Sequence, residues 1–185
     1  TLRENLRVSE VMYNPPEGSD YEFIELFNSG TNPLDIADVA LAGGVDFAFA
    51  GSSATSLAAN ATVLVVRDLT VFSTRYDTNG MNIAGEYTGK LGDGGEEVEI
   101  LGAGATEVFA FEYNDARGWP LAADGAGHSL VPRGDVISNQ LSVISDQSSV
   151  LDYGGNWRAS AFIGGSPGAA DPDPIVDVVI NEFAA

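Results

Sequence analysis

The chain has 185 residues, of which 27 are acidic and 8 basic, and its formal net charge is −19. A chain of this length can bury about 70% of its unfolded surface, so its core needs no disulfide or metal to support it. It has no cysteine, which excludes disulfides, thiolate metal ligands and cysteine nucleophiles. The acidic excess repels phosphate and argues against nucleic acids and anionic membranes as partners. The sequence contains no run of 18 apolar residues, so it predicts no membrane-spanning helix.

Two alternating segments at the start of the chain predict a pair of strands. Residues 6–13 and 21–28 each alternate so that one face of a strand can be buried, and Pro15, Pro16 and Gly18 between them favour a turn. The second segment leaves open which of its faces is the core. One face carries Phe23, Glu25 and Phe27, and the other carries Glu22, Ile24 and Leu26.

Short strands separated by turns are predicted along most of the remaining chain. Residues 62–67 form a continuous apolar run, which indicates a strand covered on both faces. Residues 96–101 and 106–113 flank the glycine-containing turn 102–105 and predict a hairpin, whose aromatic side should face the core. Shorter strand-like segments lie at 34–36, 39–41, 45–49 and 128–131.

One short helix is predicted near residues 68–76. Asp68 is a good N-cap, and Leu69, Phe72 and Tyr76 follow at spacings of three and four residues. Many short strands with a single short helix predict an all-β fold, either a sandwich or a barrel.

The last part of the chain is less regular and is predicted to close the domain. Residues 132–155 are polar with weak alternation, which predicts one long loop. The glycine-rich segment 164–168 then closes the unit, and the two prolines within 171–174 predict a stiff linker. The first domain is therefore expected to span residues 1–170.

The tail after this linker, residues 175–184, has strong β character. Its second half repeats the pattern of Arg7–Val11, with Glu182 in the place of Glu10. We interpret residues 171–185 as a linker and the first strand of a second, similar module. Such a strand is expected to pair with an open sheet edge of this chain or of a neighbouring one, which is a route to strand exchange.

Five motifs occur in order along the chain: Val8–Pro16, Tyr21–Asn28, Gly44–Phe49, Trp119–Gly127, and Asn156–Ser160 with Gly165–Gly168. Together they resemble a bacterial lamin tail domain over residues 6–170. The resemblance implies an immunoglobulin-like β-sandwich, of the kind that serves as an accessory module in large secreted or surface proteins. It implies an extracellular or cell-surface location, with any signal peptide outside this sequence, and it carries over no catalytic residues.

A glycine-rich motif invites a hydrolase interpretation. Gly164–Gly168 matches the nucleophile elbow around Ser166, but that elbow opens a helix, which Pro167 and the glycine after it do not favour. A closing turn is the alternative. His128 is the sole histidine; it could join Ser166 and an aspartate in a triad, or simply be a hydrogen-bonded strand residue. A zinc site with several histidines is excluded.

Three carboxylates on the opening strands are a second catalytic candidate. Glu10, Glu22 and Glu25 lie on segments that can pair, and paired carboxylates serve glycoside hydrolysis. The alternative is that they are the exposed carboxylates that sandwich strands commonly carry.

Acidic residues on predicted turns offer the hard oxygen ligands that calcium prefers. Their spacing does not match a helix–loop–helix calcium site, and a solvated acidic surface is the alternative. The candidate calcium ligands are Asp20, Asp93, Glu96, Asp115 and Asp124.

Aromatic residues offer a sugar-stacking surface, with Trp119 and Trp157 as the candidate binding residues beside Tyr113 and Tyr153. Tryptophan in a small sandwich is otherwise a core residue. We therefore expect a non-enzymatic secreted or cell-surface module that acts as a spacer or adhesive domain, with a protein or polysaccharide partner and no required cofactor. The alternatives are a carbohydrate-binding module and a calcium-dependent accessory domain of a secreted hydrolase.

Overall fold

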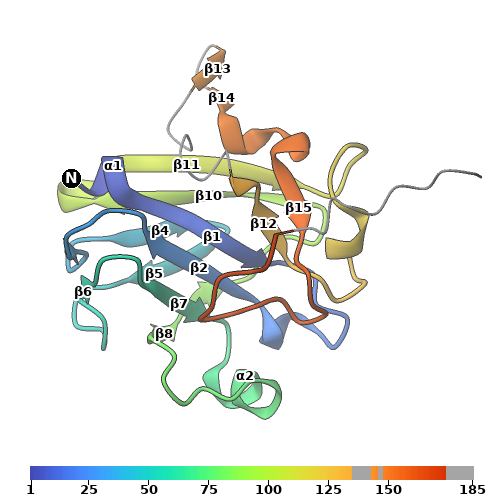
Figure 1. The fold of residues 1–185 in the computed structure, drawn as a ribbon, viewed down its shortest axis with the longest axis horizontal. Coiled ribbons are helices and arrows are strands. Elements are labelled where there is room, and N and C mark those ends of the chain that lie inside the picture. Colours follow the sequence, from blue (N-terminus) through green and yellow to red (C-terminus); the bar gives the residue numbers. More distant parts are fainter. Residues whose placement is uncertain (135–142, 146–147, 174–185) are drawn as a thin grey trace, which may run out of the picture.

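In the computed structural model, which describes residues 1–134, 143–145 and 148–173, the two opening segments pair as predicted. β1 (Leu6–Met12) lies antiparallel to β2 (Phe23–Asn28), and the two strands occupy the middle of a six-stranded sheet (Figure 1). The strand order in that sheet is β15-β12-β1-β2-β7-β8. The other four strands are β7 (Thr62–Val66), β8 (Ile83–Glu86), β12 (Leu130–Pro132) and β15 (Trp157–Ala159).

A five-stranded sheet contains the predicted hairpin. β10 (Gly95–Gly102) and β11 (Thr106–Asn114) pair antiparallel, and the aromatic side of β11 is buried as expected. The order is β11-β10-β4-β5-β9. The remaining strands are β4 (Ala40–Gly43), β5 (Val45–Ala48) and β9 (Thr88–Gly89).

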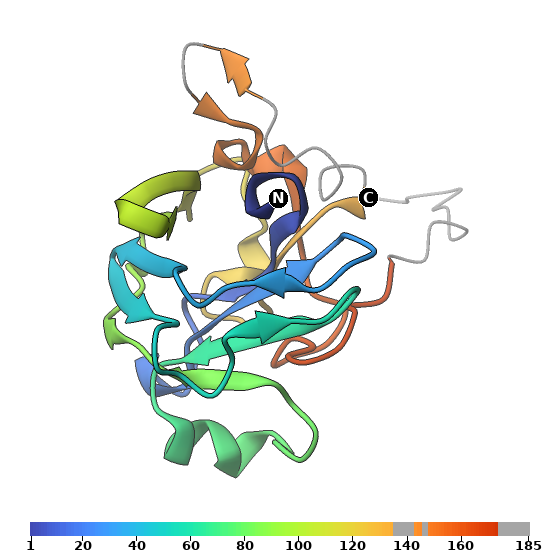
Figure 2. The same ribbon diagram turned by 90° about the vertical axis from the view of Figure 1, so that its left-hand side faces the viewer.

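The two sheets pack face to face around one large core, which confirms the predicted all-β sandwich (Figure 2). Apolar residues of β1 and β2 meet residues of β4, β10 and β11 in this core. Trp157 closes one end of it: its ring centroid lies 5.6 Å from that of Phe111, and its indole N–H donates to the carbonyl of Leu151 at 2.7 Å. Buried tryptophan contributes a large apolar area and here also has its polar atom satisfied.

A smaller cluster covers part of the outer face of the six-stranded sheet. The predicted helix is α2 (Leu69–Arg75), and the side chain of Asp68 caps it by accepting from the amide of Val71. Phe72 of this helix packs edge-on against Phe23 of β2, with ring centroids 5.9 Å apart. β2 and β7 are therefore buried on both faces, which explains why the pattern of β2 did not identify a single core side.

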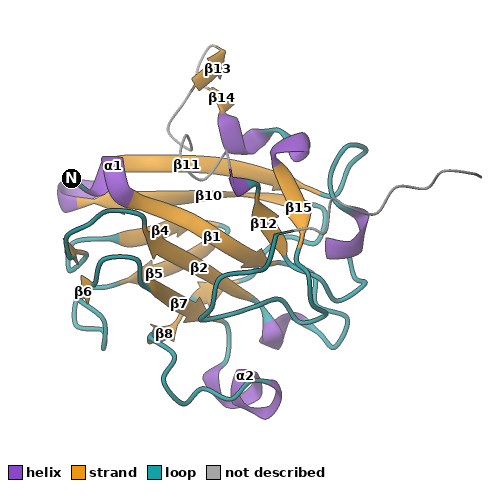
Figure 3. Cartoon of the chain, in the orientation of Figure 1, coloured by secondary structure: helices purple, strands orange, loops and turns teal. Residues whose placement is uncertain are grey.

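The remaining elements are short (Figure 3). Within the predicted loop 132–155, the described part contains regular structure. Side-chain hydrogen bonds hold it: Asp152 accepts from the backbone amide of Glu112 on β11, and Asn156 donates to the carbonyl of Val150. The interpretation of 175–184 as a strand of a second module lies outside the described residues. The short elements are α1 (Leu2–Asn5), β3 (Leu34–Asp35), β6 (Ser56–Leu57), β13 (Val143–Ser145), β14 (Ser148–Ser149), and the 3₁₀ turns η1 (Ser19–Tyr21), η2 (Ala103–Ala105), η3 (Leu121–Ala123), η4 (Val150–Asp152) and η5 (Gly154–Asn156).

The buried side chain of Asn28 ties the end of β2 to two loops. Its Nδ2 donates to the carbonyls of Asn32, Leu57 and Ala58, and its Oδ1 accepts from the amide of Gly30. Asn28→Ala leaves these buried groups without partners, so we expect the free energy of unfolding to fall by about 2–3 kcal/mol. Urea denaturation measures this, with the exposed Asn32→Ala as the control. Equal effects of the two substitutions would contradict the role of Asn28.

In the part of the chain that the structure describes, no helix has the length and apolar character that crossing a bilayer requires.

Candidate functional site

A β-bulge places two glutamates opposite each other on the outer face of the six-stranded sheet. Val8 pairs with Leu26, but the register then shifts at Ser9, so that Glu10 lies directly across from Glu25. Each of these glutamates is only 1% exposed. The alternative interpretation, in which these are exposed strand carboxylates, is therefore wrong, because other parts of the chain cover them and supply hydrogen bonds.

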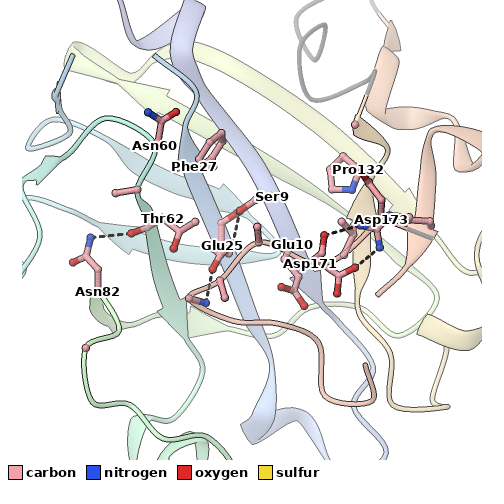
Figure 4. A pocket seen from close by; sticks show the side chains of 18 residues that line it. Ser9, Glu10, Glu25, Phe27, Asn60, Thr62, Asn82, Pro132, Asp171 and Asp173 are labelled. Carbon is pink, nitrogen blue, oxygen red and sulfur yellow. Dashed lines mark hydrogen bonds and ion pairs between the residues drawn. The ribbon is translucent and has the colours of Figure 1, made fainter. Parts of the chain in front are cut away.

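The cover is the closing segment, residues 160–173, which runs beside β1, β2 and β7 (red in Figure 1). The amide of Ser166 donates to Glu10 Oε1 at 2.9 Å, and the amide of Gly168 donates to Glu25 Oε2 at 2.6 Å. Ser9 donates its hydroxyl to Glu25 Oε1 at 2.7 Å (Figure 4). Ser129 donates its hydroxyl to Glu10 Oε1. Two backbone amides of one loop, two residues apart, thus bind two neighbouring carboxyl groups.

The glycine-rich motif of the closing segment makes this close approach feasible. Gly165 has a φ of +78°, and a Cβ atom added there would lie 2.0 Å from Glu10 Oε1. Gly168 also has a positive φ, +81°. Such positive φ values favour glycine. The structure therefore supports the interpretation of this motif as a closing turn, and the turn lies over the two carboxylates.

The proposed triad residues have other partners. The hydroxyl of Ser166 donates to Asp171 Oδ2 at 2.7 Å, and Nδ1 of His128 is hydrogen-bonded to the carbonyl of Ser160 at 2.8 Å. Neither side chain is hydrogen-bonded to the other. The histidine is thus a half-buried, hydrogen-bonded residue that lies two positions before β12, so the simpler interpretation holds except that the residue is outside the strand.

An ion pair anchors the end of the closing segment to β15. Arg158 pairs with Asp171, and their side chains are 10% and 3% exposed. Asp171 also accepts from the hydroxyl of Ser166 and from the amide of Ala161. Because a buried carboxylate is costly unless it is paired and hydrogen-bonded, this group holds the segment against the sheet.

The electrostatic consequence is that the Glu10–Glu25 pair retains protons at unusually high pH. The pKa of Glu10 is raised to about 8, mainly by burial and to a smaller extent by the charges of Glu25 and Asp171, while hydrogen bonds from Ser129 and Ser166 act in the opposite direction. Burial likewise raises the pKa of Glu25 to about 7, against hydrogen bonds from Ser9 and Gly168. The pair therefore titrates in the physiological range and has protonated and ionised states there.

A cavity of about 420 Å³ opens beside the pair, between β1, β2, β7 and the closing segment (Figure 4). Glu10 and Glu25 lie in its wall with Asp171 and Arg158. Its other walls combine apolar side chains with a few amides and hydroxyls: Phe27, Ala61, Val131, Pro132, Asn60, Thr62 and Asn82. Concave sites of this volume and composition are typical of small-ligand sites.

Glu22, the third predicted carboxylate, is buried elsewhere. Its Oε2 accepts from the hydroxyl of Tyr87 and from the amide of Leu91, and its Oε1 has no hydrogen-bond partner. Burial raises its pKa. The structure therefore joins Glu10 to Glu25 and separates both from Glu22.

Four of the five candidate calcium ligands lie near Tyr13 or Tyr113, whose ring centroids are 4.8 Å apart, and the fifth lies in η1. Asp93, Asp115 and Asp124 are exposed near Tyr13, whose pKa rises above its ordinary value through burial and then through these charges. Glu96 lies near Tyr113 and acts similarly on that phenol, while Asp20 lies in η1. Among the residues that the structure describes, no group of three or more acidic, histidine or cysteine side chains is arranged to hold a metal ion.

The candidate sugar-stacking residues do not form an exposed pair. Trp157 is buried in the core, and Tyr113 is buried as well. Trp119 is half-buried against Trp157, with ring centroids 6.1 Å apart, whereas Tyr153 is exposed. Trp157 is therefore a core residue, which was the alternative to a role in sugar stacking.

Comparison with known proteins agrees with the fold. A family model described as Lamin Tail Domain matches residues 2–115, which run from α1 through β11. No curated protein and no solved structure gives a match. The match includes Glu10 and Glu25, while the closing segment lies beyond it. Lamin tail domains form an immunoglobulin-like, non-catalytic family whose fold supports protein interaction in general. With more than half of its length matched, the chain belongs to the lamin tail domain family.

Proposed function

We propose that the chain is a non-enzymatic, secreted or cell-surface module that acts as a spacer and adhesive interaction domain in a larger multidomain protein. The observation that supports the interaction role is the outer face of the five-stranded sheet. Glu97 of β10 lies directly opposite Glu112 of β11, and both are exposed, with Glu99 two residues further along β10. None of these three carboxylates takes part in an ion pair within the described part of the chain.

This acidic face is costly to the isolated domain and suits a basic protein partner. Like charges directly opposite each other destabilise a sheet. Glu99 pairs with Ala42 on β4 and Ala110 on β11, so small side chains surround the acids and the surface is open to a flat partner. Lysine or arginine side chains at matching positions would relieve the repulsion and speed association at low salt.

Binding to model peptides tests the role of this face. A peptide with lysine at alternate positions presents its charges at the spacing of side chains on one face of a strand. We expect it to bind more tightly than a peptide of the same composition with its lysines in one block. Glu97→Gln/Glu99→Gln/Glu112→Gln should weaken this binding by about tenfold or more, with a smaller salt dependence.

The control variant is Asp20→Asn/Asp38→Asn/Asp115→Asn, which removes the same charge at exposed positions elsewhere. Equal losses in the two variants would assign binding to net charge alone and contradict a specific face. Wild-type turnover of an ester, phosphodiester or glycoside that disappears in Glu10→Gln would overturn the non-enzymatic proposal. Sugar-dependent quenching of tryptophan fluorescence, or a rise in Tm with millimolar calcium over an EDTA-treated control, would favour the carbohydrate-binding or calcium-dependent alternatives.

A further inference from the structure

The cavity beside Glu10 and Glu25 combines carboxyl groups with apolar side chains, and the interaction role proposed above does not involve it. Both carboxyl groups lie in its wall and are almost completely removed from solvent. The hydrogen bonds that Glu10 accepts, from Ser129 and Ser166, both end at Oε1. Oε2 of Glu10 is therefore the oxygen that remains for a ligand in the cavity.

The charges around the cavity sum to a negative site. Acidic groups come from three elements: Glu10 from β1, Glu25 from β2, and Asp171 with Asp173 from the closing segment. Among the described residues that line the cavity, Arg158 of β15 is the one cation, and it is paired with Asp171. An ionised Glu10–Glu25 pair therefore faces no cation of its own, and a positively charged ligand is the group that would stabilise its ionised form.

The rest of the wall limits the kind of cation. Phe27, Val131, Pro132 and the two alanines at 169–170 give the cavity an apolar side. Its volume of about 420 Å³ far exceeds that of a bare ion and accommodates a short alkyl chain with water. An apolar wall that ends at buried carboxylates matches a group with a hydrocarbon stem and a charged tip.

From this arrangement we infer that the cavity binds a primary alkylammonium group, whose charged nitrogen contacts Glu10 and Glu25 and whose alkyl chain lies along Phe27 and Val131. The group can come from a free amine or from a lysine side chain of another protein. This inference does not depend on the acidic face of the five-stranded sheet, which lies on the other sheet of the sandwich.

Ligand binding and proton release should be coupled, because the ammonium group and the protons compete for the same pair. The groups that face the pair are Asp171, Asp173 and Arg158, together with Tyr76, whose phenol lies near enough to respond to the charge of Glu10. Burial raises the pKa of Tyr76 to about 12, so it stays neutral over the range of interest. Affinity for the amine should therefore rise about tenfold from pH 6 to pH 8, as the lower of the two carboxyl groups ionises.

Isothermal titration of the whole chain with n-pentylamine tests the inference, at about 0.15 M salt so that surface attraction is screened. The expected result is one site per chain, tighter at pH 8 than at pH 6, with proton release measured in buffers of different ionisation enthalpy. Glu10→Gln and Glu25→Gln should each weaken binding at pH 8 by about tenfold or more. Glu107→Gln, which removes one exposed charge outside the cavity, should leave it unchanged, and n-pentanol should show no pH dependence.

A second set of titrations separates the two sources of the amine. Binding of n-pentylamine but not of the peptide acetyl-Gly-Lys-Gly-amide supports a free amine as ligand. Binding of both, with loss when norleucine replaces lysine, supports a partner's lysine side chain. No saturable binding of either, binding unaffected by Glu10→Gln and Glu25→Gln, or the same variant pattern obtained with calcium chloride alone would overturn the inference.

Discussion

The stability of this domain should fall as the pH rises from about 4.5 to about 8. In the unfolded chain Glu10 and Glu25 ionise near pH 4.5, whereas burial keeps them protonated in the folded domain up to pH values of about 8 and about 7. Over this window the unfolded state binds fewer protons than the folded state, so the free energy of unfolding decreases with pH. Each pH unit by which a pKa is raised corresponds to about 1.4 kcal/mol, so the two raised pKa values together correspond to a loss of up to about 8 kcal/mol.

Thermal denaturation at pH 5.5 and pH 8.5 measures this slope, with an expected Tm difference on the order of 10 °C. Glu10→Gln/Glu25→Gln keeps acceptors for the amides of the closing segment but removes both titrations, so it should flatten most of the slope and raise Tm at pH 8.5. Glu22 retains a smaller contribution of the same sign, because burial raises its pKa as well. Glu97→Gln should keep the wild-type slope. A Tm that increases from pH 5.5 to pH 8.5 would contradict the burial of the pair.

Asp171→Ala should destabilise the domain by about 3–5 kcal/mol. The substitution leaves Arg158 in a mostly buried position without its partner and removes the acceptor for the hydroxyl of Ser166 and the amide of Ala161. The closing segment then loses its anchor to β15, so the amides of Ser166 and Gly168 should exchange their hydrogens faster even under conditions where the sandwich is intact.

Chemical denaturation and residue-level hydrogen exchange test this prediction together. Asp173→Ala is the matched control, since Asp173 is exposed and has no ion pair among the described residues; its effect should stay within about 0.5 kcal/mol. Replacing both partners, Arg158→Met/Asp171→Leu, should recover part of the lost stability, because no buried charge then lacks a counter-charge. Equal effects of Asp171→Ala and Asp173→Ala would show that the segment is held by other contacts.

The strands and the helix were predictable because their signals are local. Alternation identified β1, β2 and the β10–β11 hairpin, and Asp68 with its apolar spacing identified α2. The resemblance of the ordered motifs added the immunoglobulin-like sandwich, which no single strand indicates. These features depend on neighbouring residues, whose spacing the sequence displays directly.

The burial and pairing of Glu10 and Glu25 could not be predicted from the sequence, because they depend on contacts between residues that are far apart in the chain. The bulge at Ser9, which brings Glu10 opposite Glu25, is a one-residue register shift with no marker in the alternation. Apart from Ser9, the groups that donate hydrogen bonds to the pair come from Ser129 and from the closing segment, more than a hundred residues further along the chain. One signal was present: Glu25 lies between two phenylalanines on the same face, which is unusual for a solvated strand face.

The most direct test of the buried pair is an NMR titration of the glutamate side-chain carboxyl carbons, with Glu10 and Glu25 assigned through Glu10→Gln and Glu25→Gln. Interacting carboxyl groups titrate as a pair, so both signals should report its two steps. We expect midpoints of about 7 and about 8. Midpoints near 4.5 for both groups would show that the carboxylates are solvated, and would contradict the closing of residues 160–173 over them.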